Sequence, residues 1–181
     1  MYRALVDGKW GLFAMDADGS NPRTIAEPTV PAGLDLSFGG AIYAGDGSEI
    51  LYQWGDDGGC CELWVMNADG SDPHPFVPEN GPAWTGQAVA SPDGSRIAFW
   101  HVGGTGRVSV ARADGTGPVI PTGPELPDTA RWVWAPDSSK ILMIPNDGSS
   151  PNAYLLDPDG GPWTTVPWQS DLDLDWQRVL D

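Results

Sequence analysis

Two consecutive strand-turn-strand patterns between residues 62 and 99 constrain the fold of this chain more than any other feature. The first turn, residues 67–70 (Asn-Ala-Asp-Gly), separates an apolar run from a return strand near residues 75–77. The second turn, Ser-Pro-Asp-Gly at residues 91–94, joins residues 88–90 to residues 97–99. Its proline presets φ, and its glycine supplies the positive φ that reverses the chain. The stretch therefore predicts two β-hairpins in succession.

Both turn types recur along the whole chain. The Asp-Gly pair of the first type begins at residues 18, 69, 114 and 159, and the second type recurs around Asp46, Asp93 and Asp137. The two series alternate, so each period of about 45 residues contains four short strands. That period and strand content are typical of a β-propeller blade. With 24 Gly, 18 Pro and no sustained helical periodicity, the composition also favours an all-β chain.

The segments LWVMNADGS and SPDGSRIAF resemble the repeats of the TolB-type propeller family, which are similar to WD repeats. The resemblance covers almost the whole chain and concerns the fold, because the family pattern specifies no chemistry. Ala44-Gly45 departs from the usual Ser-Pro of the pattern, and Ser138 departs from the usual glycine. The resemblance implies protein recognition, as in periplasmic envelope assemblies, and rings of six blades.

The two ends of the chain look complementary. With the strands of a blade named A to D from the centre outward, residues 2–6 match a B strand and residues 172–179 match an isolated A strand. We expect the C-terminal strand to pair with the first blade and close the ring, because closure removes an open sheet edge. The sequence thus predicts one propeller domain over residues 1–181, with four blades of four antiparallel strands. A fragment of a larger ring and an eight-bladed dimer are the alternatives.

Charge limits the possible partners. The formal net charge is −16, with only nine Lys and Arg, so the chain lacks the basic patch that nucleic acid or an anionic membrane requires. A cationic ligand or partner fits better. No segment is apolar enough to span a bilayer, and the first residues do not resemble a signal peptide. The compartment stays open: periplasmic or extracellular if a leader was removed, otherwise cytoplasmic.

The only two cysteines, Cys60 and Cys61, are adjacent. A vicinal disulfide would close a strained ring, so two free thiols are the favoured interpretation. Their spacing excludes a CxxC-type metal or redox site.

Blade geometry divides the predicted connections into two faces. The A–B and C–D turns form a turn face of short Asp-Gly tips, which offers poor material for a specific site. The B–C and D–A connections form a loop face, and long loops on a rigid scaffold commonly carry function. Exposed Trp near carboxylates can stack on a sugar or hold a cation. The predicted binding residues of the loop face are Trp54, Trp84, Trp168, Asp56, Asp57 and His101.

Metal sites have weaker support. The Asp-x-Asp-Gly turns resemble calcium loops, but the third repeat begins with Arg112 and no suitably spaced Glu follows, so hairpin turns are favoured. Asp171, Asp173 and Asp175 would share one side of the last strand. We expect structural carboxylates there, with Asp173 and Asp175 as weak candidates for holding a cation. No cofactor is predicted.

The sequence leads to three hypotheses about function. The chain contains two His, His74 and His101, and none of the GxSxG, zinc or phosphate-loop motifs. The sequence therefore predicts a non-enzymatic protein-binding scaffold. A propeller that binds a small molecule or carbohydrate through the loop-face Trp residues is the second hypothesis, and a lyase-like or lactonase-like enzyme is the third.

Overall fold

All regular structure in the described part of the chain is β-strand. The computed structural model describes residues 1–6, 9–26, 36–44, 46–56, 61–76, 85–102, 106–126, 130–145 and 152–167. Within these ranges, the strands form four antiparallel sheets, one with three strands and three with four. The predicted all-β fold with four blade-like sheets is confirmed. No helix in these ranges is long and apolar enough to cross a membrane.

Within each sheet the strand order follows the chain, so neighbouring strands are joined as hairpins. The first sheet contains β1 (Tyr2–Val6), β2 (Lys9–Ala14) and β3 (Arg23–Ala26). The second contains β4 (Leu36–Ala44), β5 (Glu49–Asp56), β6 (Cys61–Asn67) and β7 (His74–Pro75). The third contains β8 (Thr85–Ala90), β9 (Arg96–Val102), β10 (Gly106–Arg112) and β11 (Ile120–Pro121). The fourth contains β12 (Ala130–Trp134), β13 (Ile141–Pro145), β14 (Asn152–Leu156) and β15 (Thr164–Pro167).

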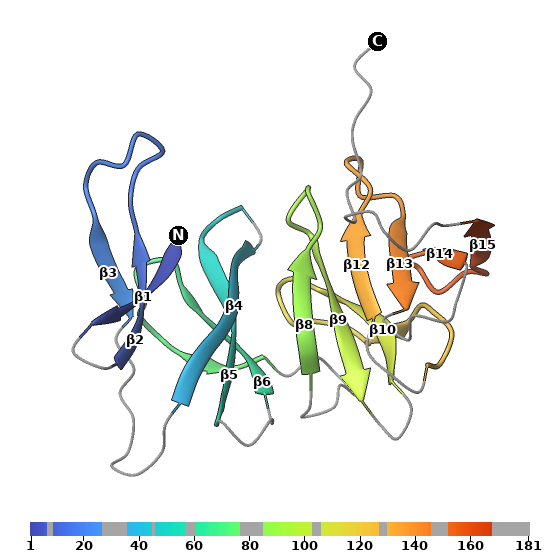
Figure 1. Cartoon of the computed structure of the whole chain (residues 1–181), viewed down its shortest axis with the longest axis horizontal. Coiled ribbons are helices and arrows are strands. Elements are labelled where there is room, and N and C mark those ends of the chain that lie inside the picture. The colour runs from blue at the N-terminus through green and yellow to red at the C-terminus, as the bar shows by residue number, and fades with distance from the viewer. Residues whose placement is uncertain are drawn as a thin grey trace.

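The four sheets follow one another in chain order, with the first and the fourth at opposite ends of the view in Figure 1. A separate apolar core fills each of the three junctions between neighbouring sheets. Leu12 and Ile50 belong to the first core, Leu51 and Phe99 to the second, and Trp100 and Trp132 to the third. The last two rings stack with their centroids 6.1 Å apart. Burial between sheets is therefore the main stabilising interaction of the fold.

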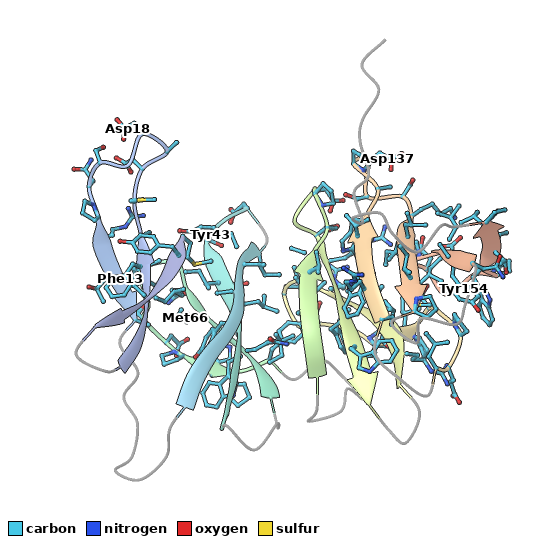
Figure 2. All side chains as sticks on the ribbon, viewed as in Figure 1. Phe13, Asp18, Tyr43, Met66, Asp137 and Tyr154 are labelled. Atoms are coloured by element: carbon cyan, nitrogen blue, oxygen red, sulfur yellow. The ribbon has the colours of Figure 1, made fainter. Side chains whose placement is uncertain are left out.

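The A–B and C–D turns of one sheet lie beside each other, as the sequence predicts. The Ala68 N–H of a C–D turn donates to Ser48 O of the A–B turn at 2.8 Å, and Ala113 N–H donates to Ser95 O at 2.9 Å. Figure 2 shows two turn tips, at Asp18 and Asp137, along the same upper edge of the molecule. This edge is the turn face, and its backbone is held by short hydrogen bonds.

Aromatic side chains at equivalent strand positions differ in burial. Trp134 is buried, and its Nε1–H donates to Val89 O of the neighbouring sheet at 3.0 Å. Tyr43 occupies the same position in the second sheet, each residue preceding the alanine of its A–B turn. An aromatic residue that recurs in register indicates packing between sheets, but Tyr43 is 39% exposed. The difference has a physical reason: the described part of the first sheet lacks the A strand against which Tyr43 would pack. Residues 172–179, predicted to supply that strand, lie outside the described residues.

Candidate functional site

Of the six predicted loop-face residues, three have a described backbone and none has a described side chain. Trp54 and Asp56 stand near the end of β5, where Trp54 pairs with Phe38 and Glu62, but the placement of their side chains is not described. His101 likewise has a described backbone only, paired with Arg107. Trp84, Asp57, Trp168, Asp173 and Asp175 fall outside the described residues, as does Cys60. The loop-face site therefore stays a prediction.

On the turn face, the aspartates use their carboxylates to hold their own turns. Asp18 Oδ1 accepts hydrogen bonds from Ser20 N–H at 2.9 Å and from Ser20 Oγ–H at 2.7 Å. Asp69 and Ser71 repeat the same pair of bonds at 2.9 and 2.6 Å. Donors aimed at the ionised form lower the pKa of the Asp18 carboxyl, the Ser20 hydroxyl being the larger cause. In the described ranges, no three His, Cys, Asp or Glu side chains gather as metal ligands would.

A pocket of about 180 Å³ lies between the second and third sheets. Its floor is apolar, because Val65, Phe76 and Ala113 line it and are 6%, 8% and 5% exposed. A single ordered water needs about 10–15 Å³ by this measure, so the pocket has room for a side-chain-sized group. Gly115 also lines the pocket, and a Cβ there would lie 3.6 Å from the Phe76 ring. The C–D turn of the third sheet thus lies close to the Phe76 ring, which forms part of the floor.

Polar side chains stand at the mouth of the pocket. Glu49 begins β5, Asp114 belongs to the C–D turn after β10, and His74 begins β7. The imidazole of His74 is 54% exposed, and its Nδ1 lies 2.8 Å from the backbone oxygen of Asp72. Because a carbonyl can only accept, Nδ1 carries the hydrogen in this arrangement. The mouth therefore combines two carboxylates and an imidazole above an apolar floor.

Hydrogen bonds within its own turn stabilise the charged form of Asp114 at the mouth. Its Oδ1 accepts from Thr116 Oγ1–H at 2.7 Å and from Thr116 N–H at 2.9 Å. These bonds, with the Thr116 hydroxyl as the largest cause and Arg112 as a smaller one, lower the pKa of Asp114 to about 2. The Arg112 Nη2–Asp114 Oδ2 distance is 3.3 Å, and both side chains are mostly exposed. Asp114 is consequently anionic at any ordinary pH.

Sequence reasoning did not find this pocket, although a signal for it was present. The first residue after each A–B turn is Glu49, Arg96 or Lys140, so the second sheet alone has an acid where the next two have a base. The repeat pattern makes the Asp-Gly turns look equivalent, and the difference lies in the residue that follows each turn. The pocket arises where two sheets meet, and repeat patterns describe each sheet separately.

Comparison with known proteins shows the fold. Neither a protein-family model nor a curated protein sequence matches the chain. Among solved structures, TolB from Acinetobacter baumannii matches with TM-score 0.62 and 19% identity over 92% of this chain and 39% of that one. An oligogalacturonate lyase in complex with manganese matches with TM-score 0.70 and 15% identity over 90% and 43%. A chain of a nidogen/laminin complex matches with TM-score 0.59 and 18% identity over 87% and 57%.

These identities are low, and the chain spans about two fifths to three fifths of the length of these three structures. The similarity therefore concerns the arrangement of the sheets and does not indicate an activity for this chain. Together with the four consecutive antiparallel sheets and the apolar core in each junction, it shows that this chain has the β-propeller fold.

Proposed function

We propose that this chain is a non-enzymatic binding scaffold of the TolB-like propeller type, with a protein as its partner. The observation that carries the proposal is the pocket between the second and third sheets, which pairs an apolar floor with anionic groups at its mouth. Such a combination suits recognition, because the floor supplies contact area and the charges supply orientation. The formal charge of −16 favours a cationic partner surface.

The structural neighbours are compatible with this role. The nidogen/laminin match is, by its name, part of a complex between proteins, and TolB has the same kind of fold. Folds of this type serve several functions, so the neighbours support the proposal only by analogy. The predicted loop face, with Trp54, Trp84 and Trp168, remains the second candidate surface for the partner.

The main alternative is a small-molecule or carbohydrate-binding propeller that uses those Trp residues. It is favoured by the oligogalacturonate lyase match, since that protein is named for a carbohydrate substrate. The same match keeps a lyase-like enzyme as the third hypothesis. A glycan array followed by calorimetric titration of any hit separates these alternatives, because a protein-binding scaffold should give no glycan hit.

The surface that binds the partner can be tested by substitution. We expect Trp54→Ala or Trp84→Ala to weaken a partner bound on the loop face at least tenfold, since losing an aromatic anchor commonly costs about 2 kcal/mol or more. Asp69→Asn, on the turn face and not among the residues that line the pocket, should leave binding intact. All variants must keep the circular dichroism of the parent. If Asp69→Asn abolishes binding and both Trp variants are silent, the loop face is not the binding surface.

A further inference from the structure

The pocket occupies a position that is filled by a side chain at the next junction. Glu49 in the second sheet and Arg96 in the third each follow an Asp-Gly-Ser turn and begin the B strand. Asp114 and Asp159 are likewise equivalent, each being the third residue of a C–D turn. These two junctions thus bring the first residue of one B strand toward the C–D turn of the following sheet.

At the junction of the third and fourth sheets this arrangement holds a guanidinium. Arg96 Nη1 lies 2.9 Å from Asp159 Oδ1, and the Arg96 side chain is 30% exposed. The arginine belongs to one sheet and the carboxylate to the next. The pair is a cation bound between two blades, provided by the chain itself.

At the junction of the second and third sheets the cation is replaced by an acid. Glu49 takes the position of Arg96, and Asp114 takes the position of Asp159. Both line the pocket of about 180 Å³. Two carboxylates that face one space repel each other unless a positive group lies between them. The pocket therefore keeps the carboxylate of the Arg96 site and has Glu49 in place of its arginine, while the first residue of the C–D turn is Arg112 here and Asp157 at the Arg96 site.

We infer that this pocket binds the guanidinium group of an arginine side chain supplied from outside the chain. The inference rests on the proposed function and names the chemistry of the bound group. A planar guanidinium can donate to Glu49 and Asp114 together. Its methylene stem can lie along Val65 and Ala113, with the Phe76 ring as the aromatic part of the floor.

One internal group competes for the site. Arg112 contacts Asp114 through Nε at 3.4 Å and Nη2 at 3.3 Å, and its side chain is 66% exposed. Such an exposed pair between residues two apart contributes little, so a ligand that also contacts Glu49 and the floor displaces it. Lysine fits less well, because an ammonium is a compact point charge without the planar fork.

The test is calorimetric titration of the whole chain with N-acetyl-arginine-methylamide at neutral pH and low salt. The probes for comparison are the lysine analogue and the citrulline analogue, which keeps the shape of arginine without its charge. We expect citrulline to bind at least about tenfold more weakly, because a hydrogen bond to a charged group contributes more than a neutral one. Equal binding of arginine and citrulline, or no arginine binding, overturns the inference.

Two matched substitutions locate the binding. Glu49→Gln and Asp69→Asn each remove one negative charge with little change of shape, and only Glu49 lines the pocket. We expect Glu49→Gln to weaken arginine at least about fivefold and Asp69→Asn to change it less than about twofold. Glu49→Arg should abolish binding by placing the internal cation of the next junction in the pocket. If Glu49→Arg does not fold, the comparison of Glu49→Gln with Asp69→Asn still tests where arginine binds. Equal effects of these two substitutions would show non-specific attraction to an acidic protein and overturn the inference.

A further titration distinguishes a guanidinium that belongs to a protein segment from one that belongs to a small compound. A pentapeptide Gly-Gly-Arg-Gly-Gly that binds at least about tenfold more tightly than the blocked amino acid indicates a protein segment, since added backbone contacts raise affinity. Equal affinity indicates a small guanidinium compound. Failure of all arginine probes, while a partner still binds and is lost in Trp54→Ala, would reject this pocket and leave the binding-scaffold proposal standing.

Discussion

At the residue scale, the turn glycines combine a backbone conformation with a close approach between sheets. Gly70 has φ +87°, and a Cβ at this position would overlap the backbone oxygen of Ile25 in the first sheet. Gly19 has a similar φ of +84°, but no described atom lies within 4 Å of its Cβ position. The two glycines therefore share the conformational requirement and differ only in the contact.

This pair gives a matched prediction. Gly19→Ala should lower the free energy of unfolding by about 1 kcal/mol, the usual penalty for alanine at positive φ. Gly70→Ala should lower it by a further 1–3 kcal/mol or so, because the added methyl group must push two sheets apart. Urea denaturation of both variants measures the difference. Equal losses would mean that the junction between the first two sheets opens freely.

Lowering the pH should reveal how much another turn residue, Asp93, contributes to the free energy of unfolding. Hydrogen bonds from the Ser91 hydroxyl and then the Ser95 backbone lower its pKa to about 2, against about 3.9 in an unfolded chain. A carboxylate whose pKa is lowered by folding stabilises the native state above the unfolded pKa, and this stabilisation is lost as the pH falls toward the folded pKa. The window is therefore about pH 4 to pH 2.

We expect Asp93→Asn to lose less unfolding free energy than the parent between pH 5 and pH 2.5, since the asparagine does not titrate. The difference should be modest because Asp93 is exposed and solvent screens its interactions. Urea denaturation at both pH values measures it. A parent and variant with the same pH dependence would show that the Ser91 and Ser95 bonds persist in the unfolded chain or are absent in solution.

Ser138 shows why residue-level departures from the repeat are hard to interpret from sequence. It stands where the other A–B turns have glycine, and the repeat pattern alone gives no reason for the exchange. In the structure Ser138 has φ 62°, and its Oγ accepts a hydrogen bond from Asp93 N–H of the neighbouring sheet at 3.1 Å. A contact between sheets thus offsets the backbone strain, and no local pattern encodes it.

At the element scale, the strands and turns were predictable because each hairpin carries its own turn residues. The pattern located β6 to β9 and the hairpins of the first sheet from β1 to β3, since proline, aspartate and glycine fix where the chain reverses. The pocket was not predictable in the same way. It depends on which side chain of β5 meets the turn after β10, and these residues are 65 positions apart in the chain.

Contacts between A strands hold the third and fourth sheets together. The Trp134 Nε1–H bond to Val89 O spans β12 and β8, and the ring is 3% exposed. Trp134→Phe should cost about 1–3 kcal/mol, because it removes this hydrogen bond and part of the buried ring. Tyr43→Phe changes a polar aromatic group at the equivalent but exposed position and should cost less than about 0.5 kcal/mol. Thermal unfolding of both variants tests the contrast, and similar losses would contradict it.

At the scale of the whole molecule, the first and the last sheet each have one side on which a further contact between sheets is expected. Inside the molecule, the D-strand positions Ile25, Phe76 and Thr122 are buried against the next sheet, whereas the equivalent Val166 is only half-buried. The turn at Gly19 has no neighbouring sheet within the described residues, and Figure 1 places these two sheets at opposite ends. A further junction could be made within one chain or between two copies of it. Light scattering distinguishes a monomer of 19.2 kDa from a dimer of twice that mass.

The prediction that residues 172–179 supply the A strand of the first sheet can be tested by deleting them. Within the described residues the first sheet contains β1, β2 and β3, so an A strand would pair with β1. Deleting residues 172–181 should leave the edge of β1 open, and we expect aggregation or a clearly lower melting temperature, because open edges are templates for pairing between chains. Leu174→Pro should have a similar effect without shortening the chain, since proline cannot donate to a strand ladder. Deleting Asp181 alone is the control and should change nothing. A truncated protein that stays monomeric with an unchanged melting temperature would show that β1 is not paired by this segment.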